Sequence, residues 1–245
     1  MEWSDDAIVL AARRHGETDV ILETLTRHYG RHLGLVHGGA SRRVKAALMP
    51  GNALNVTWRA RLSEHLGSFT VELRRERAGA LLENRESLIG LNAFAAITRE
   101  VLPEREPHEP VHIAAEILLD AIASNDFLHW GPLYVRWEMG VLDSLGFALD
   151  LARCAATGQT DDLRYVSPKS GRAVSSNAGA PYRGRLFELP GFLIEPREAS
   201  ASEDEIEAGL RLTGYFLLER VLAPNRRQIP AARLRLDALA ARESA

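Results

Sequence analysis

The sequence predicts an α+β protein in which a small, closed, five-stranded β-barrel precedes a mainly helical region. Up to about residue 80, apolar and polar residues alternate with the two-residue period of half-buried strands. Beyond that point, apolar residues recur at the three-to-four-residue spacing of amphipathic helices. The 245 residues are 46% hydrophobic and 26% charged, a composition typical of folded domains.

The N-terminal part contains five short strand-like runs separated by turns that contain glycine. The runs cover residues 7–13, 19–26, 32–37, 53–62 and 68–75. Five strands within about 75 residues favour an OB-fold, the five-stranded barrel whose strands and loops bind single-stranded nucleic acid. An SH3-like barrel fits the same pattern and remains the alternative.

The remainder of the chain is predicted to be helical, with one irregular insertion. The helical runs cover residues 85–102, 111–123, 132–149, 202–222 and 231–241. The insertion is polar and rich in Gly, Ser and Pro, with short strands expected near 164–168 and 171–175. We therefore expect four regions: the barrel (1–80), the first part of a helical domain (81–153), the insertion (154–200) and C-terminal helices packing on the helical domain (201–245).

Basic residues are concentrated in the barrel. Residues 27–77 hold ten basic and three acidic side chains, although the chain has a net charge of -3. Within this segment, Gly38 and Gly39 precede Arg42, Arg43 and Lys45. Glycines let a backbone approach a ligand closely, and basic side chains bind phosphates. The pattern predicts an anion-binding loop, and the alternative is a solvated polar face balanced by acids elsewhere.

Catalytic motifs are incomplete in this chain. The string HEPVH at 108–112 matches a zinc-protease pattern, but Pro110 disfavours helical geometry before it and excludes His108 from the helix. The string VHGGA is similar to an esterase oxyanion loop, but no G-x-S-x-G nucleophile motif accompanies it. We expect no catalytic residues and no metal ligands, hence no enzyme, with a hydrolase as the rival class.

The insertion has the spacing of a four-cysteine zinc site but lacks three of the cysteines. Thr157, Ser175 and Ala178 stand with Cys154 where two C-x-x-C units would place thiolates. The sequence predicts no zinc cofactor. The single cysteine and the absence of a run of 18 apolar residues predict a cytoplasmic protein that does not contact the membrane.

Two long stretches resemble the bacterial RecO family of DNA repair and recombination mediators. They are GETDVILETLTRHYGRHLGLVHGGASRRVKAALMPGNAL (16–54) and RWEMGVLDSLGFALDLARCAATG (136–158), the latter followed by YVSPKSGRAV (165–174). The resemblance implies an OB-fold that binds single- and double-stranded DNA, a helical domain and, in many members, a four-cysteine zinc finger.

The same resemblance implies a function. Family members bind DNA without sequence specificity, anneal complementary strands and, with RecR, help load RecA onto single-stranded DNA coated by single-strand DNA-binding protein. A nucleoid-associated location follows from this role. An OB-fold adaptor that binds RNA or an acidic protein partner remains the alternative.

Two sets of site residues are predicted. The DNA-binding set comprises Arg31, His37, Arg42, Arg43, Lys45, Arg59 and Arg74. Tyr29 and Trp58 are candidates for base stacking, with the barrel core as the alternative for Trp58. On the third helix, Tyr134, Arg136 and Trp137 are predicted to bind the acidic tail of single-strand DNA-binding protein. The alternative there places Trp137 in the core and leaves Arg136 exposed.

Overall fold

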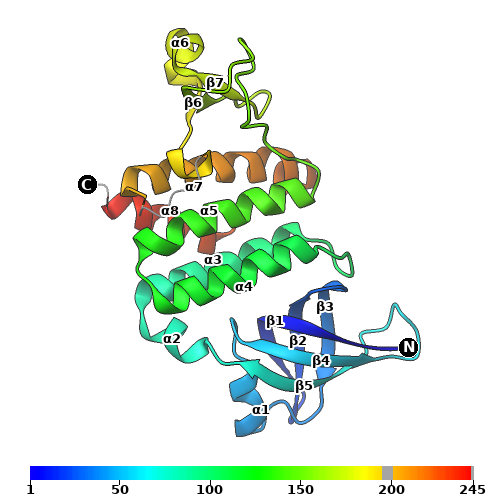
Figure 1. Cartoon of the computed structure of the whole chain (residues 1–245). Helices are drawn as coiled ribbons and strands as arrows, with labels where there is room; N and C mark the ends of the chain where they lie inside the picture. Colours follow the sequence, from blue (N-terminus) through cyan, green and yellow to red (C-terminus); the bar gives the residue numbers. More distant parts are fainter. Residues whose placement is uncertain (195–200, 244–245) are drawn as a thin grey trace. The chain divides into compact units, whose positions relative to one another are not determined.

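The computed structural model describes residues 1–194 and 201–243 (Figure 1). Its backbone contacts group the chain into two compact units, Met1–Ser124 and Asn125–Ala245, called unit 1 and unit 2 below. The four regions expected from the sequence stay a prediction, and the last two of them include residues 195–200 and 244–245, which lie outside the described residues.

Unit 1 begins with a closed barrel of five strands in the order β1-β2-β3-β5-β4. The strands are β1 (Glu2–His15), β2 (Asp19–Thr26), β3 (Gly30–Val36), β4 (Ala53–Arg59) and β5 (Ser68–Arg75). Neighbours are antiparallel except β3 and β5, which pair in parallel at Leu35 and Ser68. This arrangement confirms the predicted OB-fold over the SH3-like alternative.

The inward side chains of the strands, together with Leu48 from the segment between β3 and β4, form the barrel core. The buried members are Ala7, Val9, Val20, Leu22, Val36, Leu48, Leu54, Val56, Trp58 and Phe69. Trp58 is only 2% exposed, and its Nε1 donates to the Leu66 carbonyl oxygen at 3.0 Å. The core alternative for Trp58 is therefore correct. A Cβ atom on Gly67 would lie 2.5 Å from the Trp58 ring, so that close packing needs glycine at this position.

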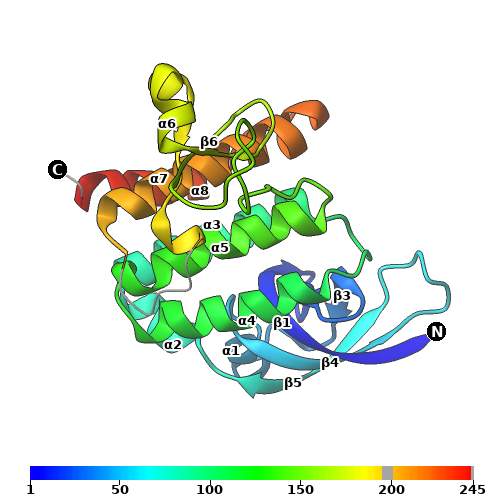
Figure 2. The same ribbon diagram turned by 45° about the horizontal axis from the view of Figure 1, so that its top comes forward.

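The segment predicted to be a basic loop contains a short helix, α1 (Arg42–Ala47). Val44, Ala47 and Leu48 pack against the barrel core, at the three-and-four-residue spacing of one helix face. The intervening basic side chains stay exposed. The expectation of a loop over the whole of 36–48 is thus wrong from Arg42 onward, because the barrel end offers an apolar surface that a six-residue helix can cover. In Figures 1 and 2, α1 lies at one end of the barrel and the N-terminus at the other.

Unit 1 continues with α2 (Ala78–Glu83), α3 (Arg85–Val101) and α4 (Glu109–Ser124). Asn84 caps α3 by accepting a hydrogen bond from the Glu86 backbone N–H. Because α4 begins at Glu109, His108 precedes the helix and His112 lies within it. His108 thus lies just outside the helix, as the sequence predicts, and its carbonyl oxygen accepts the first helical hydrogen bond, from the His112 N–H at 3.0 Å.

Unit 2 combines helices with a small three-stranded sheet in the order β7-β6-β8. Its elements are α5 (Phe127–Ser144), β6 (Leu163–Val166), β7 (Ala173–Ser175), α6 (Ser176–Gly179), the 3₁₀-helix η1 (Ala180–Arg185), β8 (Phe187–Glu188), the 3₁₀-helix η2 (Gly191–Leu193), α7 (Glu203–Phe216), the π-helix η3 (Leu217–Leu222), the 3₁₀-helix η4 (Ala223–Asn225) and α8 (Ala231–Glu243). Short strands in the insertion were expected, and β6 and β7 lie at the expected places.

The boundaries of α5 differ from the predicted 132–149. Asp126 caps the helix by accepting a hydrogen bond from the His129 backbone N–H, so α5 starts before Pro132 and contains it. The helix ends at Ser144, and Gly146 adopts a φ of 83°, a left-handed conformation that ends helices. None of the helices in the described part of the chain is long and apolar enough to cross a membrane.

Candidate nucleic-acid interface

Three of the predicted DNA-binding arginines form ion pairs within unit 1. Arg31 lies on β3 with its side chain 14% exposed; its Nη1 is 2.7 Å from a Glu23 carboxylate oxygen, and its Nε donates to the Leu102 carbonyl oxygen. Arg59 pairs with Glu2 at 2.7 Å. Arg74 pairs with Glu116 of α4 and lies 3.8 Å from Asp6. DNA phosphates would have to compete with these carboxylates.

The arginine-rich end of β5 joins the barrel to α4. The Arg77 side chain is 2% exposed; its Nε donates to Asp120 at 2.6 Å, and its Nη2 pairs with Glu116. Arg75 also pairs with Asp120. A buried, hydrogen-bonded arginine of this kind holds elements together, so this part of the basic segment has a structural role.

The other predicted cations are on α1 and have no such partners. Arg42, Arg43 and Lys45 are exposed, and none of them forms an ion pair with any residue that the structure describes. Free guanidinium and ammonium groups on one short helix can each bind a phosphate oxygen. Of the predicted DNA-binding set, these three are the best placed for phosphate contact.

A neighbouring turn adds two arginines that the sequence reasoning missed. The β1–β2 turn is hydrogen-bonded to the segment before α1, because the Ala40 N–H donates to the Thr18 carbonyl oxygen at 2.8 Å. Arg13 and Arg14 lie at the end of β1 beside this turn. Both are exposed; Arg14 donates to the Glu17 carbonyl oxygen, and Arg13 has no ion pair within the described residues.

The basic segment identified from the sequence begins at residue 27 and therefore excludes Arg13 and Arg14. The run ARRHG, which places both arginines before a turn glycine, is the signal that could have found them. The hydrogen bond from Ala40 to Thr18 joins the turn to the segment before α1, and we call the exposed basic residues at the turn and on α1 the α1 cluster. Its members are Arg13, Arg14, Arg42, Arg43 and Lys45.

Asp19 fixes the backbone between β3 and α1. Its Oδ1 accepts the Gly38 N–H at 2.9 Å, and its Oδ2 lies 3.2 Å from His37 Nδ1. The Gly38 hydrogen bond, helped by Thr18 and His37, lowers the pKa of the Asp19 carboxyl below its usual value. Asp19 thus stays ionised at neutral pH and orients the glycine turn. The predicted DNA-binding residue His37 is exposed but engaged with this carboxylate.

The candidate stacking residues lie at the other end of the barrel. Tyr29, in the β2–β3 turn, is 38% exposed, and its ring stacks on Trp3 with a centroid distance of 4.1 Å. Trp3 stacks in turn on the buried Trp58 at 5.7 Å. The structure therefore does not bring these aromatic rings together with the α1 cluster.

The predicted tail-binding residues of α5 are mostly in the core of unit 2. Tyr134 and Trp137 are 0% and 1% exposed. Arg136 is half-buried; its Nη2 donates to the Phe192 carbonyl oxygen at 2.6 Å. The alternative that places Trp137 in the core is correct, and of the three only Arg136 reaches solvent.

The remnant of the zinc site does not fit the metal. Cys154 Sγ lies 3.4 Å from Ser175 Oγ and accepts the Ser175 N–H at 3.3 Å. Burial opposes ionisation of this thiol, but hydrogen bonds from Ser175 and Thr157 outweigh burial and lower its pKa to about 6. One thiolate with two hydroxyls and a methyl group is not a zinc donor set. Among the described residues, no group of three or more His, Cys, Asp or Glu side chains is arranged to hold a metal.

Comparison with known proteins identifies the family. Residues 1–76 match the family described as "Recombination protein O N terminal", and residues 82–228 match "Recombination protein O C terminal". Relatives named "DNA repair protein RecO" include that of Rhodospirillum rubrum, 51% identical over 96% of this chain and 94% of the relative. The Cereibacter sphaeroides protein is 51% identical over 99% of this chain and 100% of its own length, and that of Rhizobium etli 49% over 95% and 90%. The chain therefore belongs to the RecO family.

Proposed function

We propose that this chain binds DNA without sequence specificity through the α1 cluster and acts in DNA repair and homologous recombination as a mediator rather than an enzyme. The observation that supports this most directly is the contrast among the basic residues of the barrel. Arg31, Arg59 and Arg74 are paired with carboxylates, whereas the α1 cluster gathers five exposed cations without ion pairs in the described structure. The names of the relatives support the repair role.

The chemistry of the surface suits a mediator. Phosphate contacts position DNA but carry no sequence information, so a site built from arginine and lysine accepts any strand. On single strands the logarithm of affinity falls with the logarithm of salt by about 0.7 per phosphate, so five contacts give a slope of about -3.5. Two strands held on one cationic surface repel each other less, which favours annealing without any catalytic residue.

The finer activities implied by the family are part of the proposal. The chain anneals complementary strands and, with RecR, helps load RecA onto DNA coated by single-strand DNA-binding protein. It works in the cytoplasm at the nucleoid and needs no zinc. Arg136, the half-buried arginine of α5, is the residue through which a protein tail would be contacted.

A matched pair of double variants tests the DNA site. Arg42→Ala/Arg43→Ala removes two free charges from α1, and Arg59→Ala/Arg61→Ala removes two charges at the end of β4 that pairs with the start of β1. Fluorescence anisotropy of a labelled single-stranded oligonucleotide across a salt series gives affinity and slope for each protein. We expect weaker binding and a slope shallower by about 1.4 for the α1 variant, with little change for the control.

The outcomes separate the alternatives. Equal losses in the two variants would show that affinity depends on overall charge rather than on the α1 cluster, and unchanged binding by the α1 variant would place DNA away from that cluster. No binding of DNA by the native chain, with salt-dependent binding of RNA or of an acidic peptide, would establish the adaptor function instead.

A further inference from the structure

Unit 2 carries an exposed aromatic and cationic segment that the DNA site of the barrel does not use. The segment is η1, whose sequence APYRGR places Tyr182 next to Arg183 and Arg185. Tyr182 is 57% exposed, and the two arginines are exposed and form no ion pair within residues 1–194 and 201–243. A Cβ atom on Gly184 would meet no atom within 4 Å, so the backbone between the arginines is also open to a ligand.

The segment is held firmly at both ends. At its start, Gly179 packs so closely on the Tyr165 ring of β6 that a Cβ atom there would lie 2.3 Å from it. At its end the chain enters β8, where Phe187 pairs with Val166 of β6. Because the small sheet fixes both ends, Tyr182 is presented to solvent on an ordered turn rather than on a loose loop.

The local charge is positive. Residues 163–188 contain five basic side chains and one acidic side chain. Arg164 lies 3.6 Å from Asp162, and Arg172 lies 3.2 Å from Asp150. Lys169 and the two η1 arginines form no ion pair within the described residues, so the excess positive charge of residues 163–188 lies on these three side chains.

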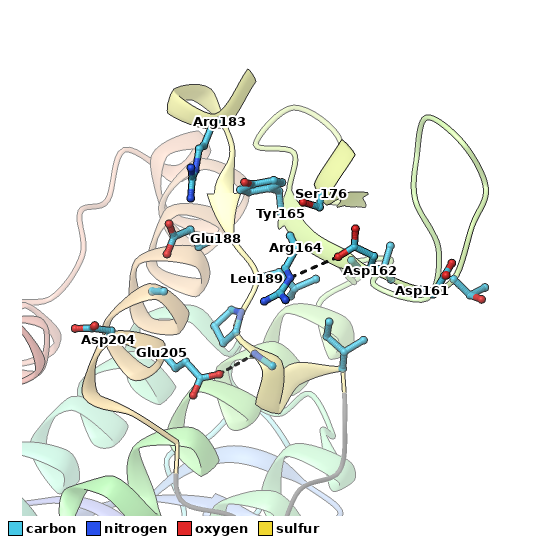
Figure 3. Close-up of a pocket in the computed structure, with 16 residues that line it drawn as sticks. Asp161, Asp162, Arg164, Tyr165, Ser176, Arg183, Glu188, Leu189, Asp204 and Glu205 are labelled. Atoms are coloured by element: carbon cyan, nitrogen blue, oxygen red, sulfur yellow. Dashed lines mark hydrogen bonds and ion pairs between the residues drawn. The ribbon is translucent and has the colours of Figure 1, made fainter. Parts of the chain in front are cut away.

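A neighbouring hollow of about 920 Å³ limits where an anion can lie (Figure 3). Its charged lining is mostly acidic: Asp161, Asp162, Glu188, Asp204 and Glu205 outnumber Arg164 and Arg183. Figure 3 shows Arg183 at the rim, beside Glu188. Tyr182 and Arg185 do not line the hollow. Phosphates are therefore repelled from the hollow and attracted to the outer side of η1.

We propose that the η1 segment Tyr182–Arg185 is a second contact for single-stranded DNA, in which an unpaired base stacks on Tyr182 and the adjacent arginines bind phosphates. Stacking on an exposed ring requires a base that is free of its complement, which favours single strands over duplex. The inference rests on the proposed DNA-binding function and adds a second contact, in unit 2, to the one in the barrel.

The test uses the full chain and labelled oligothymidylate in a salt series. We expect Tyr182→Ala to weaken binding about five-fold or more through lost stacking, with an unchanged salt slope, and Tyr182→Phe to restore the affinity. Arg183→Ala/Arg185→Ala should make the slope shallower by about 1.4. The matched control, Arg211→Ala/Arg235→Ala, removes two exposed arginines from α7 and α8 of the same unit and should change neither quantity.

A direct readout uses an oligonucleotide carrying photoreactive bromodeoxyuridine, whose crosslink to Tyr182 is mapped by mass spectrometry. A crosslink there, together with the affinity loss, supports the proposal. If the η1 variants bind like the control while Arg42→Ala/Arg43→Ala loses binding, the η1 contact is refuted and the barrel site stands. If the η1 variants lose only the binding of an acidic peptide, η1 is a protein contact and the proposal is refuted. Failure of the native chain to bind any DNA would refute the proposed function itself.

Discussion

Replacing Arg233 by methionine removes a guanidinium that lies fully buried in unit 2. Arg233 projects from α8, and both it and Glu138 of α5 are 0% exposed. Its Nε lies 2.7 Å from one carboxylate oxygen of Glu138, and its Nη2 lies 2.9 Å from the other. Nη2 also donates to the Leu210 carbonyl oxygen of α7 at 2.9 Å, so one side chain links three helices.

The loss of stability expected for Arg233→Met follows from the carboxylate that the substitution leaves in the core. Without Arg233, the Glu138 carboxylate stays buried and loses its cationic partner, while the Thr213 hydroxyl still donates a hydrogen bond to it. Breaking a buried ion pair in this way costs about 3 to 5 kcal/mol. That is a large part of a typical unfolding free energy of about 5 to 15 kcal/mol. Replacing both partners, as in Arg233→Met/Glu138→Leu, should be far milder because the fully buried carboxylate is removed with the guanidinium, and only the partly exposed Asp237 loses its partner.

Urea unfolding of the full chain, followed by tryptophan fluorescence, measures these differences, and hydrogen exchange of the α8 amides reports the local effect. The control is Arg235→Met on the same helix, an exposed position where we expect a change within about 0.5 kcal/mol. A loss below about 1 kcal/mol for Arg233→Met, or an equal loss for the double variant, would contradict the reasoning from the buried charge.

Two further predictions concern pH and metal. Burial lowers the pKa of His32 and His112 below the usual 6.5, so the unfolded chain binds more protons than the folded chain in this range. The free energy of unfolding is therefore highest above pH 6.5, where both histidines are neutral in the folded and the unfolded chain. It decreases as the pH falls from 6.5 towards the lowered pKa of each histidine in the folded chain, by at most about 1.4 kcal/mol per pH unit for each histidine. Urea unfolding across that window measures it, and His112→Phe should flatten the curve; a flat native curve would contradict it. For metal, Thr157→Cys/Ser175→Cys/Ala178→Cys should bind one zinc per chain while the native chain binds none. The 3.4 Å between Cys154 Sγ and Ser175 Oγ is near the roughly 3.8 Å between thiolates on a tetrahedral zinc. Stoichiometric zinc in the purified native chain would refute this.

The barrel strands were predictable because their signal is local. Each run alternates within itself, so residues 19–26 and 68–75 were identified with the bounds that β2 and β5 have in the structure. The short helix α1 was not predictable in this way. Its apolar residues Val44 and Leu48 become a buried face only where the closed barrel supplies a surface to cover.

The basic site was predictable in kind but not residue by residue. The sequence does not distinguish Arg31 from Arg42 as a candidate for phosphate binding. In the structure, however, Arg31 is paired with Glu23, and Arg42 has no ion pair with a described residue. The partners of Arg59 and Arg74 are Glu2 and Glu116, which lie far away in sequence. Charge runs alone therefore overstate the number of cations that are free to bind DNA.

The same pairing explains how a chain of net charge -3 can present a cationic surface. In unit 1, several carboxylates form ion pairs where helices α3 and α4 contact the barrel. Glu23 pairs with Arg31 and Arg99, and Glu116 pairs with Arg74 and Arg77. Acids used in this way neutralise arginines that hold the fold together, and in the described structure they form no ion pair with a residue of α1. Beside α1, Glu17 and Asp19 lie at the β1–β2 turn, so the five cations of the α1 cluster face these two carboxylates and keep a net positive charge. The placement of the acids, more than the number of arginines, makes the α1 end of the barrel the surface for DNA that we propose.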